Sequence, residues 1–383
     1  MADQPFLPYG RQSVDADDIE AVLQVLRGDW LTTGPAVDAF ESGLSSFTHA
    51  RHARVVNSGT AALHAAYAAA GLGKGHTILT SPLTFVATAH CALWMGADVR
   101  FADVDPTTGL IDADSAAALV DSSTRLIVPI DYAGHPCDYT ALRALAEKTG
   151  TTLVADAAHS LGATYEGDPV GTLAHLTATS FHPVKPITSA EGGAVLTDDP
   201  ELDRRVAQFR NHGMERDPGR LRDEDAGAWA YEVQALGLNY RMPDVLCALG
   251  LSQLGKLESF IARRQELAAR YARDLEDVGG IDLPPTAANT TPGWHIYVIR
   301  VQDAGRRRAL FDRLRADGLG VQVHYDPVHL HPFYADRGHR AGECPNAEDF
   351  SSRAISIPLY PALADGDVDR VVATIRAAAA DLL

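Results

Sequence analysis

The chain has 383 residues, of which 46% are hydrophobic and 22% are charged, and its formal net charge is −17 at pH 7. These proportions are ordinary for a soluble globular enzyme, and the length allows one large and one small domain. The negative charge argues against a nucleic-acid partner, because a DNA-binding protein needs a basic patch to displace counterions from phosphates. Cys91, Cys137, Cys247 and Cys344 include no Cys-x-x-Cys pair, so neither a disulfide framework nor a zinc site is predicted.

The N-terminal residues and the apolar runs predict where the protein works. Residues 1–5 lack the basic start and the apolar core of a signal peptide. No apolar run approaches the roughly 20 residues that span a bilayer. We therefore expect a cytoplasmic protein with no membrane partner.

The first half of the chain predicts a parallel sheet. Residues 55–56 form a short apolar run that breaks at Gly59 into an alanine-rich helix. Free backbone N–H groups at such a helix start can bind a phosphate, although a purely structural cap is the alternative. Beyond it, apolar strands alternate with helical stretches, which is the βαβ pattern. We expect strands at residues 77–80, 98–102, 126–130, 153–155, 177–181 and 194–197, and helices at residues 85–95, 114–121 and 139–148.

The second half predicts a long loop and a smaller domain. Residues 213–235 are charged and have no clear period, so we interpret them as a loop that is either functional or a solvated excursion. We place the large domain at residues 1–250 and the small αβ domain at residues 251–383. In the small domain we expect strands at residues 295–301 and 320–324, and helices at residues 306–317 and 367–382, the last capped by Asp365 or Asp367.

Lys185 stands in a setting that differs from those of the other three lysines. It lies between two prolines in the loop of residues 180–188, packed by Phe181 and Val184. Such packing lowers the pKa of an amine, as a nucleophilic lysine requires, whereas an ordinary loop lysine paired with an acid is the alternative. This setting suggests pyridoxal phosphate as the cofactor. We interpret the other lysines as solvated surface residues: Lys74, Lys148 and Lys256.

Asp156 ends the apolar strand that precedes this loop. Ligands of open parallel sheets bind just beyond the carboxyl ends of the strands. An aspartate there can pair with the pyridinium nitrogen of the cofactor, which makes the ring an electron sink. A helix N-cap is the alternative role. The order of phosphate helix, strand-end aspartate and loop lysine matches the type I fold of pyridoxal-phosphate enzymes.

Six motifs resemble those of the DegT/DnrJ/StrS family of sugar-nucleotide aminotransferases, and together they cover nearly the whole chain. They are residues 57–63, 84–88, 156–159, 180–185, 192–193 and 237–242. Within that family, residues 182–188 together with residues 131–134 most resemble one branch. That branch aminates C4 of a UDP-linked 4-keto-6-deoxy-N-acetylhexosamine in the pseudaminic acid pathway.

The resemblance implies an α/β protein with the type I fold of pyridoxal-phosphate-dependent transferases. That fold has a large domain, in which helices flank a mostly parallel central sheet, and a smaller C-terminal αβ domain. The resemblance also implies a homodimer with shared active sites. The expected cofactor is pyridoxal 5′-phosphate, with pyridoxamine phosphate as its intermediate form. The expected substrates are a nucleotide sugar and an amino acid donor, for which we expect L-glutamate.

Lys185 and Asp156 are the expected catalytic residues. Transamination requires an amine that bonds to the cofactor and later moves a proton between the substrate carbon and the cofactor, which is the role of Lys185. Asp156 would pair with the ring nitrogen. The resemblance places Phe85 against the ring face, where a core aromatic is the alternative, and His159 near the ring hydroxyl. The expected phosphate contacts are Gly59, Thr60, Ala61 and Ser180.

The remaining candidates concern the substrate and the second subunit. By the resemblance, Asn239 reaches the cofactor phosphate of the other subunit and Arg241 lies near the nucleotide, although Asn239 alone would be a turn residue. We expect no metal, because the histidines of residues 324–339 lie in a Pro-rich loop without helical i, i+4 spacing. The candidate sugar-nucleotide contacts are Tyr9, His182, His324 and Tyr325.

Other functions are less consistent with these residues. An aminotransferase that acts on a different ketosugar or on a cyclitol needs the same cofactor site and stays open. The dehydratase branch of the family carries histidine at the lysine position, and Lys185 disfavours it. A regulatory DNA-binding protein should contain a basic helix-turn-helix. The net charge of −17 argues against this function.

Overall fold

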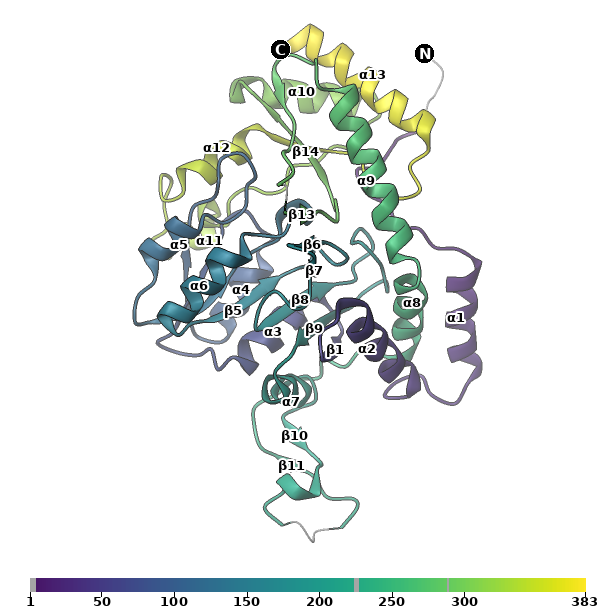
Figure 1. The fold of residues 1–383 in the computed structure, drawn as a ribbon, viewed down its shortest axis with the longest axis vertical. Coiled ribbons are helices and arrows are strands. Elements are labelled where there is room, and N and C mark those ends of the chain that lie inside the picture. The colour runs from purple at the N-terminus through teal and green to yellow at the C-terminus, as the bar shows by residue number, and fades with distance from the viewer. Residues whose placement is uncertain (1–4, 224–226, 288) are drawn as a thin grey trace.

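A seven-stranded sheet forms the centre of the computed structural model, which describes residues 5–223, 227–287 and 289–383 (Figure 1). Residues 1–4 of the N-terminal segment and residues 224–226 of the expected loop lie outside the described residues. Strand β9 runs antiparallel to both of its neighbours, and the other pairs are parallel, so the prediction of a mostly parallel sheet is confirmed. In spatial order the strands are β1 (His52–Val56), β9 (Gly193–Thr197), β8 (Leu176–Ser180), β5 (Thr152–Asp156), β4 (Thr124–Val128), β2 (Thr77–Thr80) and β3 (Asp98–Phe101).

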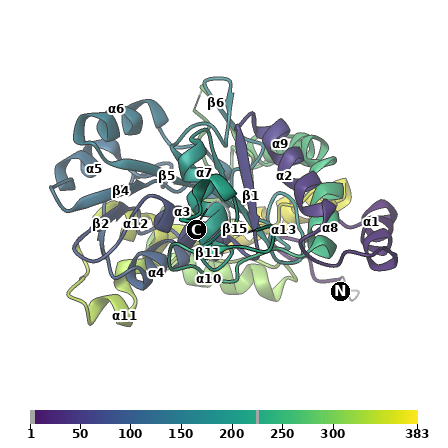
Figure 2. The same ribbon diagram turned by 90° about the horizontal axis from the view of Figure 1, so that it is seen from below.

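Helices cover both faces of this sheet, which explains why its strands are apolar on both sides. Successive side chains of a strand point to opposite faces. Ile78 and Val154 therefore pack on one side, and Leu79 and Leu153 on the other. Figure 2 shows these two layers, with α3 and α4 on one side of the strands and α5 and α6 on the other. The first layer holds α3 (Gly59–Ala69), α4 (Ala87–Trp94) and α7 (Pro200–Phe209), the second holds α5 (Ala113–Leu119) and α6 (Tyr139–Thr149), and α2 (Pro35–Thr48) and α8 (Asp244–Leu254) cover the β1 end.

The C-terminal part of the chain builds a second, smaller core. Leu267, Leu310 and Val371 come from three helices and meet there, and Leu7 of the N-terminal segment joins them. The expected boundary after residue 250 falls inside α8, and the division into two domains stays a prediction. The elements of this part are the antiparallel strands β12 (Ile281–Asp282), β14 (Tyr297–Val301) and β15 (Ala354–Ile357), and the helices α9 (Leu257–Asp274), α10 (Ala304–Ala316) and α13 (Asp365–Leu382).

The strand expected at residues 320–324 is wrong. This segment makes single bridges to two different partners, Leu319 to Leu7 and Gln322 to Ser356. Because the partner changes between these two positions, no continuous ladder of hydrogen bonds can form. The chain instead turns toward the carboxyl edge of the large sheet.

The capping residue expected for the last helix is also wrong. Helix α13 begins after Ala364, whose side chain makes no capping hydrogen bond. Asp365 and Asp367 lie in the first turn, where a carboxylate favours the positive end of the helix dipole. Arg263 Nη2 donates to Asp365 Oδ1 at 2.7 Å, so this carboxylate ties α13 to α9.

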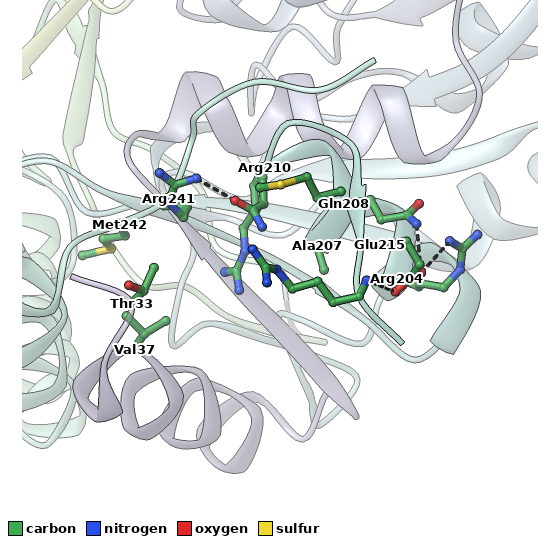
Figure 3. A pocket seen from close by; sticks show the side chains of 12 residues that line it. Thr33, Val37, Arg204, Ala207, Gln208, Arg210, Glu215, Arg241 and Met242 are labelled. Atoms are coloured by element: carbon green, nitrogen blue, oxygen red, sulfur yellow. Dashed lines mark hydrogen bonds and ion pairs between the residues drawn. The ribbon is translucent and has the colours of Figure 1, made fainter. Parts of the chain in front are cut away.

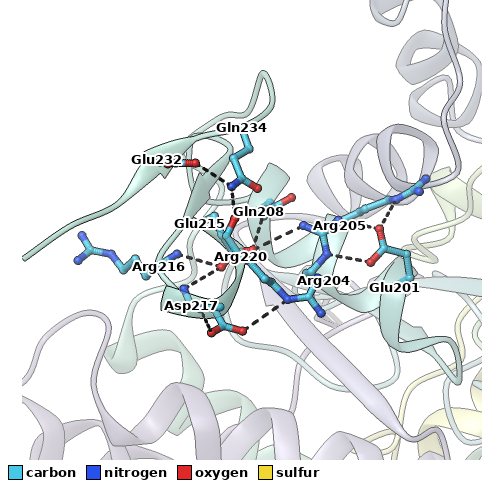
Figure 4. Close-up of polar contacts among 11 residues, drawn as sticks. Glu201, Arg204, Arg205, Gln208, Glu215, Arg216, Asp217, Arg220, Glu232 and Gln234 are labelled. Atoms are coloured by element: carbon cyan, nitrogen blue, oxygen red, sulfur yellow. Dashed lines mark hydrogen bonds and ion pairs between the residues drawn. The ribbon is translucent and has the colours of Figure 1, made fainter. Parts of the chain in front are cut away.

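The described residues of the expected loop, 213–223 and 227–235, form a hairpin that projects from the body of the protein (Figure 1). Most of them lie outside helices and strands, as expected for a loop. Its strands are β10 (Met214–Glu215) and β11 (Glu232–Val233). Glu215 anchors the base, because Gln208 Nε2 on α7 donates to its Oε2 at 3.0 Å and Arg204 pairs with it at 3.6 Å (Figure 4). Gln234 Nε2 donates to the carbonyl oxygen of Arg220 at 2.7 Å and closes the other side.

Helices α8 and α9 follow each other with a bend of 55°. Among the described residues, no single helix is long and apolar enough to cross a membrane, and these two reach that length and composition only as a bent pair. Helix α8 packs against α1 and α2. The remaining elements are α1 (Ala16–Arg27), α11 (Pro332–Ala335), α12 (Pro345–Arg353), the small sheet of β13 (Thr290–Thr291), β6 (Thr164–Tyr165) and β7 (Asp168–Pro169), and the 3-10 turns Tyr132–Gly134, Pro218–Arg220 and Val328–Leu330.

Candidate active site

A cavity of about 360 Å³ opens at the carboxyl edge of the large sheet. The ends of β5 and β8, the starts of α3 and α4, and the loop after β8 enclose it, and residues 295 and 324–325 close it from the C-terminal part. The structure brings most of the predicted site residues to this cavity. Those predicted to hold the cofactor are Lys185, Asp156, Gly59, Thr60, Phe85, His159 and Ser180, and those predicted to contact the substrate are Tyr9, His182, His324 and Tyr325.

Lys185 lies in a loop that backbone hydrogen bonds hold in place. Its N–H donates to the carbonyl oxygen of His182 at 2.9 Å, and Phe181 exchanges backbone bonds with Gly192 at 2.8 Å and Ser189 at 3.0 Å. Burial lowers the pKa of the Lys185 amine to about 8, against the opposing effect of the Asp156 charge. A substantial fraction of this amine is therefore unprotonated near neutral pH, as a nucleophile requires.

The other three lysines lie away from this cavity. Lys74 and Lys148 are exposed, as expected. Lys256 differs from the expectation of a solvated residue, because it is only partly exposed and its Nζ pairs with Asp18 at 2.9 Å. Its ion pair connects α9 to the buried face of α1, which is a structural role.

Asp156 is the last residue of β5, and both of its carboxylate oxygens accept hydrogen bonds. Thr88 Oγ1 donates to Oδ2 at 2.7 Å, and the Ala158 N–H donates to Oδ1 at 3.2 Å. Burial raises the pKa of this carboxyl, whereas these two donors and the Lys185 charge lower it. Turns follow Asp156 in place of a helix, so the alternative role as a helix N-cap does not apply.

The start of α3 is the predicted phosphate site. Ser58 Oγ caps this helix by accepting from the Ala61 N–H at 3.0 Å, so Ala61 is already paired and does not line the cavity. In the part of the chain that the structure describes, no protein acceptor takes the N–H groups of Gly59 and Thr60. A Cβ atom at Gly59 would lie 2.7 Å from Ser180 Cβ, which shows how closely the helix start and the end of β8 approach. We therefore revise the predicted set to Gly59, Thr60 and Ser180.

Aromatic rings line part of the cavity. Phe85 is 61% exposed, which rules out the alternative of a core aromatic. His159 Nε2 lies 3.1 Å from the Tyr325 hydroxyl, and the His324 ring lies 5.2 Å from that of Tyr9. Burial and then the Lys185 charge lower the pKa of His159, and the same causes lower the pKa of His324 to about 4. Both imidazoles are therefore neutral at pH 7.

Sequence reasoning assigned no role to His295 and Thr88, which also line the cavity. The His295 ring lies 4.3 Å from that of His159, and its position depends on backbone bonds to a distant turn. Its N–H donates to the carbonyl oxygen of Ala133 at 2.9 Å. Gly134 makes this approach possible, because with φ at +93° a Cβ atom there would lie 2.8 Å from the His295 nitrogen. From the sequence, residues 295–301 indicated only a strand.

Asn239 and Arg241 lie at a different place on the surface. Arg241 lines a second cavity of about 320 Å³, in which its Nη1 donates to Asn211 Oδ1 at 2.6 Å (Figure 3). Asn239 is exposed and makes a backbone bridge to the same Asn211. Within a single chain, Asn239 and Arg241 therefore do not line the cavity that contains Lys185.

Two of the histidines expected not to bind a metal, His329 and His339, form pairs with glutamates. His329 Nε2 lies 2.9 Å from Glu348 Oε1, and His339 Nδ1 lies 2.9 Å from Glu343 Oε2. Among the described residues, no group of three or more histidine, cysteine or acidic side chains is placed to hold a metal ion. All four cysteines are buried free thiols.

The residues of the first cavity fit pyridoxal phosphate. A partly buried amine, a buried strand-end carboxylate and two unpaired N–H groups at a helix start correspond to the aldehyde, the ring nitrogen and the phosphate of that cofactor. The exposed Phe85 ring lines the same space. The amine lies in the loop after β8, the carboxylate at the end of β5, the N–H groups at the start of α3 and Phe85 just before α4. The fold of the large sheet therefore brings these four groups to one cavity.

Comparison with known proteins adds an independent line of argument. The DegT/DnrJ/EryC1/StrS aminotransferase family matches residues 12–376. Spore coat polysaccharide biosynthesis protein SpsC of Bacillus subtilis is 37% identical over 376 residues, which cover 97% of this chain and 96% of that protein.

Two proteins of known structure show the same fold over nearly the whole chain. Helicobacter pylori PseC, an aminotransferase involved in the biosynthesis of pseudoaminic acid, superposes with a TM-score of 0.93 and 31% identity, over 98% of this chain and all of that one. Spr1654 of Streptococcus pneumoniae, a putative sugar aminotransferase, superposes in its PMP form with a TM-score of 0.92 and 27% identity, covering 98% of this chain and 100% of that chain. Its PLP form gives the same score and identity, covering 99% and 100%.

Proposed function

This chain belongs to the DegT/DnrJ/EryC1/StrS aminotransferase family and is a pyridoxal-phosphate-dependent sugar aminotransferase, and we propose that it aminates C4 of a UDP-linked 4-keto-6-deoxy-N-acetylhexosamine with L-glutamate as the donor. The observation that carries the catalytic part is the placement of the Lys185 amine in one cavity with the buried Asp156 carboxylate. The choice of sugar is supported by the likeness to PseC and by the motifs at residues 131–134 and 182–188.

Two residues carry the chemistry in this proposal. Lys185 Nζ is the amine that would hold the cofactor, and once free it would act as the base that takes and returns the proton at the reacting carbon. The Asp156 carboxylate would pair with the ring nitrogen and keep it protonated. When bound, the cofactor supplies an electron-withdrawing ring that carries the amino group from one substrate to the other.

The other residues of the cavity bind and orient. The N–H groups of Gly59 and Thr60 and the Ser180 hydroxyl hold the phosphate, where the positive end of the α3 dipole favours an anion. Phe85, which lines the cavity, would cover one face of the ring. His159, held by its contact with the Tyr325 hydroxyl, is neutral and directs a hydrogen bond toward the ring oxygen.

The anionic substrates support a homodimer with shared sites. Both the sugar diphosphate and the glutamate carboxylates need cations, yet in the described residues Lys185 is the single lysine or arginine that lines the cavity. Arg241 and Asn239 lie outside it, next to the projecting hairpin. We infer that they serve the site of a second subunit. Nucleotide sugars and glutamate are both cytoplasmic metabolites, and we place the enzyme in the cytoplasm, with no nucleic-acid or membrane partner.

The function is tested by following the nitrogen atom. The purified enzyme is incubated with L-[15N]glutamate and the UDP-4-keto sugar, and the product is examined by NMR. We expect 2-oxoglutarate and a sugar that carries 15N on C4, and no product from Lys185→Ala. Nitrogen on another carbon, or a preference for a dTDP-linked ketosugar, would replace the proposed substrate while leaving the aminotransferase assignment intact.

A further inference from the structure

A chain of hydroxyl groups leads from the cavity wall to Asp156. Thr84 Oγ1 and Thr88 Oγ1 are 2.9 Å apart, and Thr88 Oγ1 lies 2.7 Å from Asp156 Oδ2. All three side chains are buried, with exposed fractions of 3%, 0% and 6%. Water therefore does not compete for these contacts, and each proton in the chain has one place to go.

The direction of this chain follows from counting protons. An ionised carboxylate only accepts, so the one hydroxyl proton of Thr88 must be donated to Asp156. Thr88 can then only accept from Thr84, whose hydroxyl becomes the donor at the start of the chain. Two aligned hydroxyl dipoles thus point at the carboxylate, and hydrogen bonds in such a series strengthen one another.

Thr88 also joins the helices that flank the cavity. It lies in the first turn of α4, and its carbonyl oxygen accepts from the Tyr67 hydroxyl of α3 at 3.0 Å. Tyr67 is fully buried. One residue therefore links the phosphate helix α3, the helix that follows Phe85, and the carboxylate at the end of β5.

We propose that Thr88 is a positioning residue that fixes the orientation of Asp156 and stabilises the negative charge of the carboxylate that would pair with the ring nitrogen. With Oδ2 held by Thr88 and the turn N–H of Ala158 on Oδ1, rotation of the carboxylate is restricted. The inference rests on the assignment of Asp156 to the ring nitrogen in the function proposed above. It assigns to Thr88 no contact with substrate or cofactor.

The electrostatic balance at Asp156 agrees with this role. Burial raises the pKa of the carboxyl, and the Thr88 hydroxyl is the largest of the effects that oppose it, ahead of the Ala158 N–H and Lys185. The other titratable groups that interact with its charge are buried and neutral or share its sign: Cys91, Tyr67, Tyr139, Tyr325 and Asp131. Without the Thr88 hydroxyl, Lys185 would be the main positive charge that stabilises the ionised carboxylate of Asp156.

The test removes the hydroxyl and keeps the shape. Thr88→Val is close in volume and β-branched, whereas Thr88→Ser keeps the hydroxyl, and Thr84→Val removes only the outer hydroxyl. A hydrogen bond to a charged group contributes enough to change an equilibrium about ten- to a hundred-fold, so we expect Thr88→Val to slow the half-reaction with L-glutamate by that factor. Thr88→Ser should stay near the natural rate, and Thr84→Val should fall between them. Equal loss in the Val and Ser variants, or a natural rate in Thr88→Val, would overturn the proposal.

A second measurement uses the protein without cofactor. Because the pKa of Asp156 is raised in the folded state, the folded chain holds a proton that the unfolded chain releases, and stability falls as pH rises above the ordinary value of about 3.8. Loss of the Thr88 hydroxyl raises that pKa further, so the melting temperature of cofactor-free Thr88→Val should fall more steeply between pH 4 and pH 8 than that of Thr88→Ser. Parallel curves for the two variants would contradict the proposal.

A double variant separates this inference from the function on which it rests. If Thr88 acts through Asp156, Thr88→Val should cause no further loss of rate in an Asp156→Asn background, and a full additional loss would overturn the proposal. A near-natural rate in Asp156→Asn alone would instead remove the assignment of Asp156 to the ring nitrogen. The pH dependence of unfolding would still report whether Thr88 supports the carboxylate.

Discussion

Replacing Gly59 by alanine tests the phosphate site through a single methyl group. The added Cβ atom would lie 2.7 Å from Ser180 Cβ and 2.9 Å from Ser180 Oγ, whereas ordinary contacts begin near 3.4 Å. Ser180 Cβ is fixed to the backbone at the end of β8, so the helix start and the strand end must move apart by several tenths of an ångström. Overpacking of this kind costs about 1–3 kcal/mol. Where the helix start relieves this strain by moving away from the phosphate position, binding has to restore it, and affinity falls by up to roughly 5- to 150-fold.

The assay compares pyridoxal phosphate with pyridoxal, which lacks the phosphate. Cofactor-free Gly59→Ala and the natural protein are titrated with each compound and followed by absorbance, and melting temperatures are recorded alongside. Gly73→Ala is the control, because no atom lies within 4 Å of its added Cβ. We expect Gly59→Ala to lose affinity for pyridoxal phosphate and to keep most of its affinity for pyridoxal. The reasoning is refuted if both affinities fall equally, or if the phosphate compound binds Gly59→Ala as tightly as it binds the control.

Three further predictions address other parts of the site. Trace labelling of the cofactor-free protein with an amine-selective reagent should show Lys185 gaining reactivity with a midpoint at a pH of about 8, since burial lowers its pKa; a midpoint near the ordinary lysine value of about 10.4 would contradict this. Mixing inactive Lys185→Ala with an Asn239→Ala protein should restore one competent site per mixed dimer, because both lesions then fall in the same site, and exchange of subunits without recovery would remove Asn239 from the shared site. Gly134→Ala should lower the melting temperature and disturb the position of His295, because the new Cβ would lie 2.8 Å from that backbone nitrogen; an unchanged melting temperature and rate would show that the turn has room for it.

The sequence predicted those site residues whose chemistry is marked by the local pattern. Asp156 ends an apolar run, and Lys185 lies between prolines, so each could be recognised from its immediate neighbours. The βαβ alternation fixed their order and therefore the edge of the sheet at which they meet. The same local signals predicted the strands and helices of the large sheet to within a few residues of their observed ends.

Other features depend on contacts between distant segments, which a local pattern does not record. The position of His295 depends on the left-handed turn at Gly134, and the role of Thr88 depends on a carboxylate 68 residues further along the chain. The segment of residues 320–324 has strand-like residues, but its partners change within it, so tertiary context overrides propensity. Ala61 was assigned to the phosphate because it lies at a helix start, and the sequence does not show which of these N–H groups the Ser58 side chain accepts from.

The place of β1 at the edge of the sheet has a consequence for synthesis on the ribosome. Val56 of β1 pairs with Gly193 of β9, so the strand that leads into the phosphate helix has no neighbour in the sheet until the chain beyond β9 has emerged. Contacts between such distant residues slow folding, and an unpaired apolar strand invites association with other chains in the meantime. A nascent chain that stops before residue 193 therefore cannot assemble the cofactor site, and the first pyridoxal phosphate can be captured only after about half of the protein has been made.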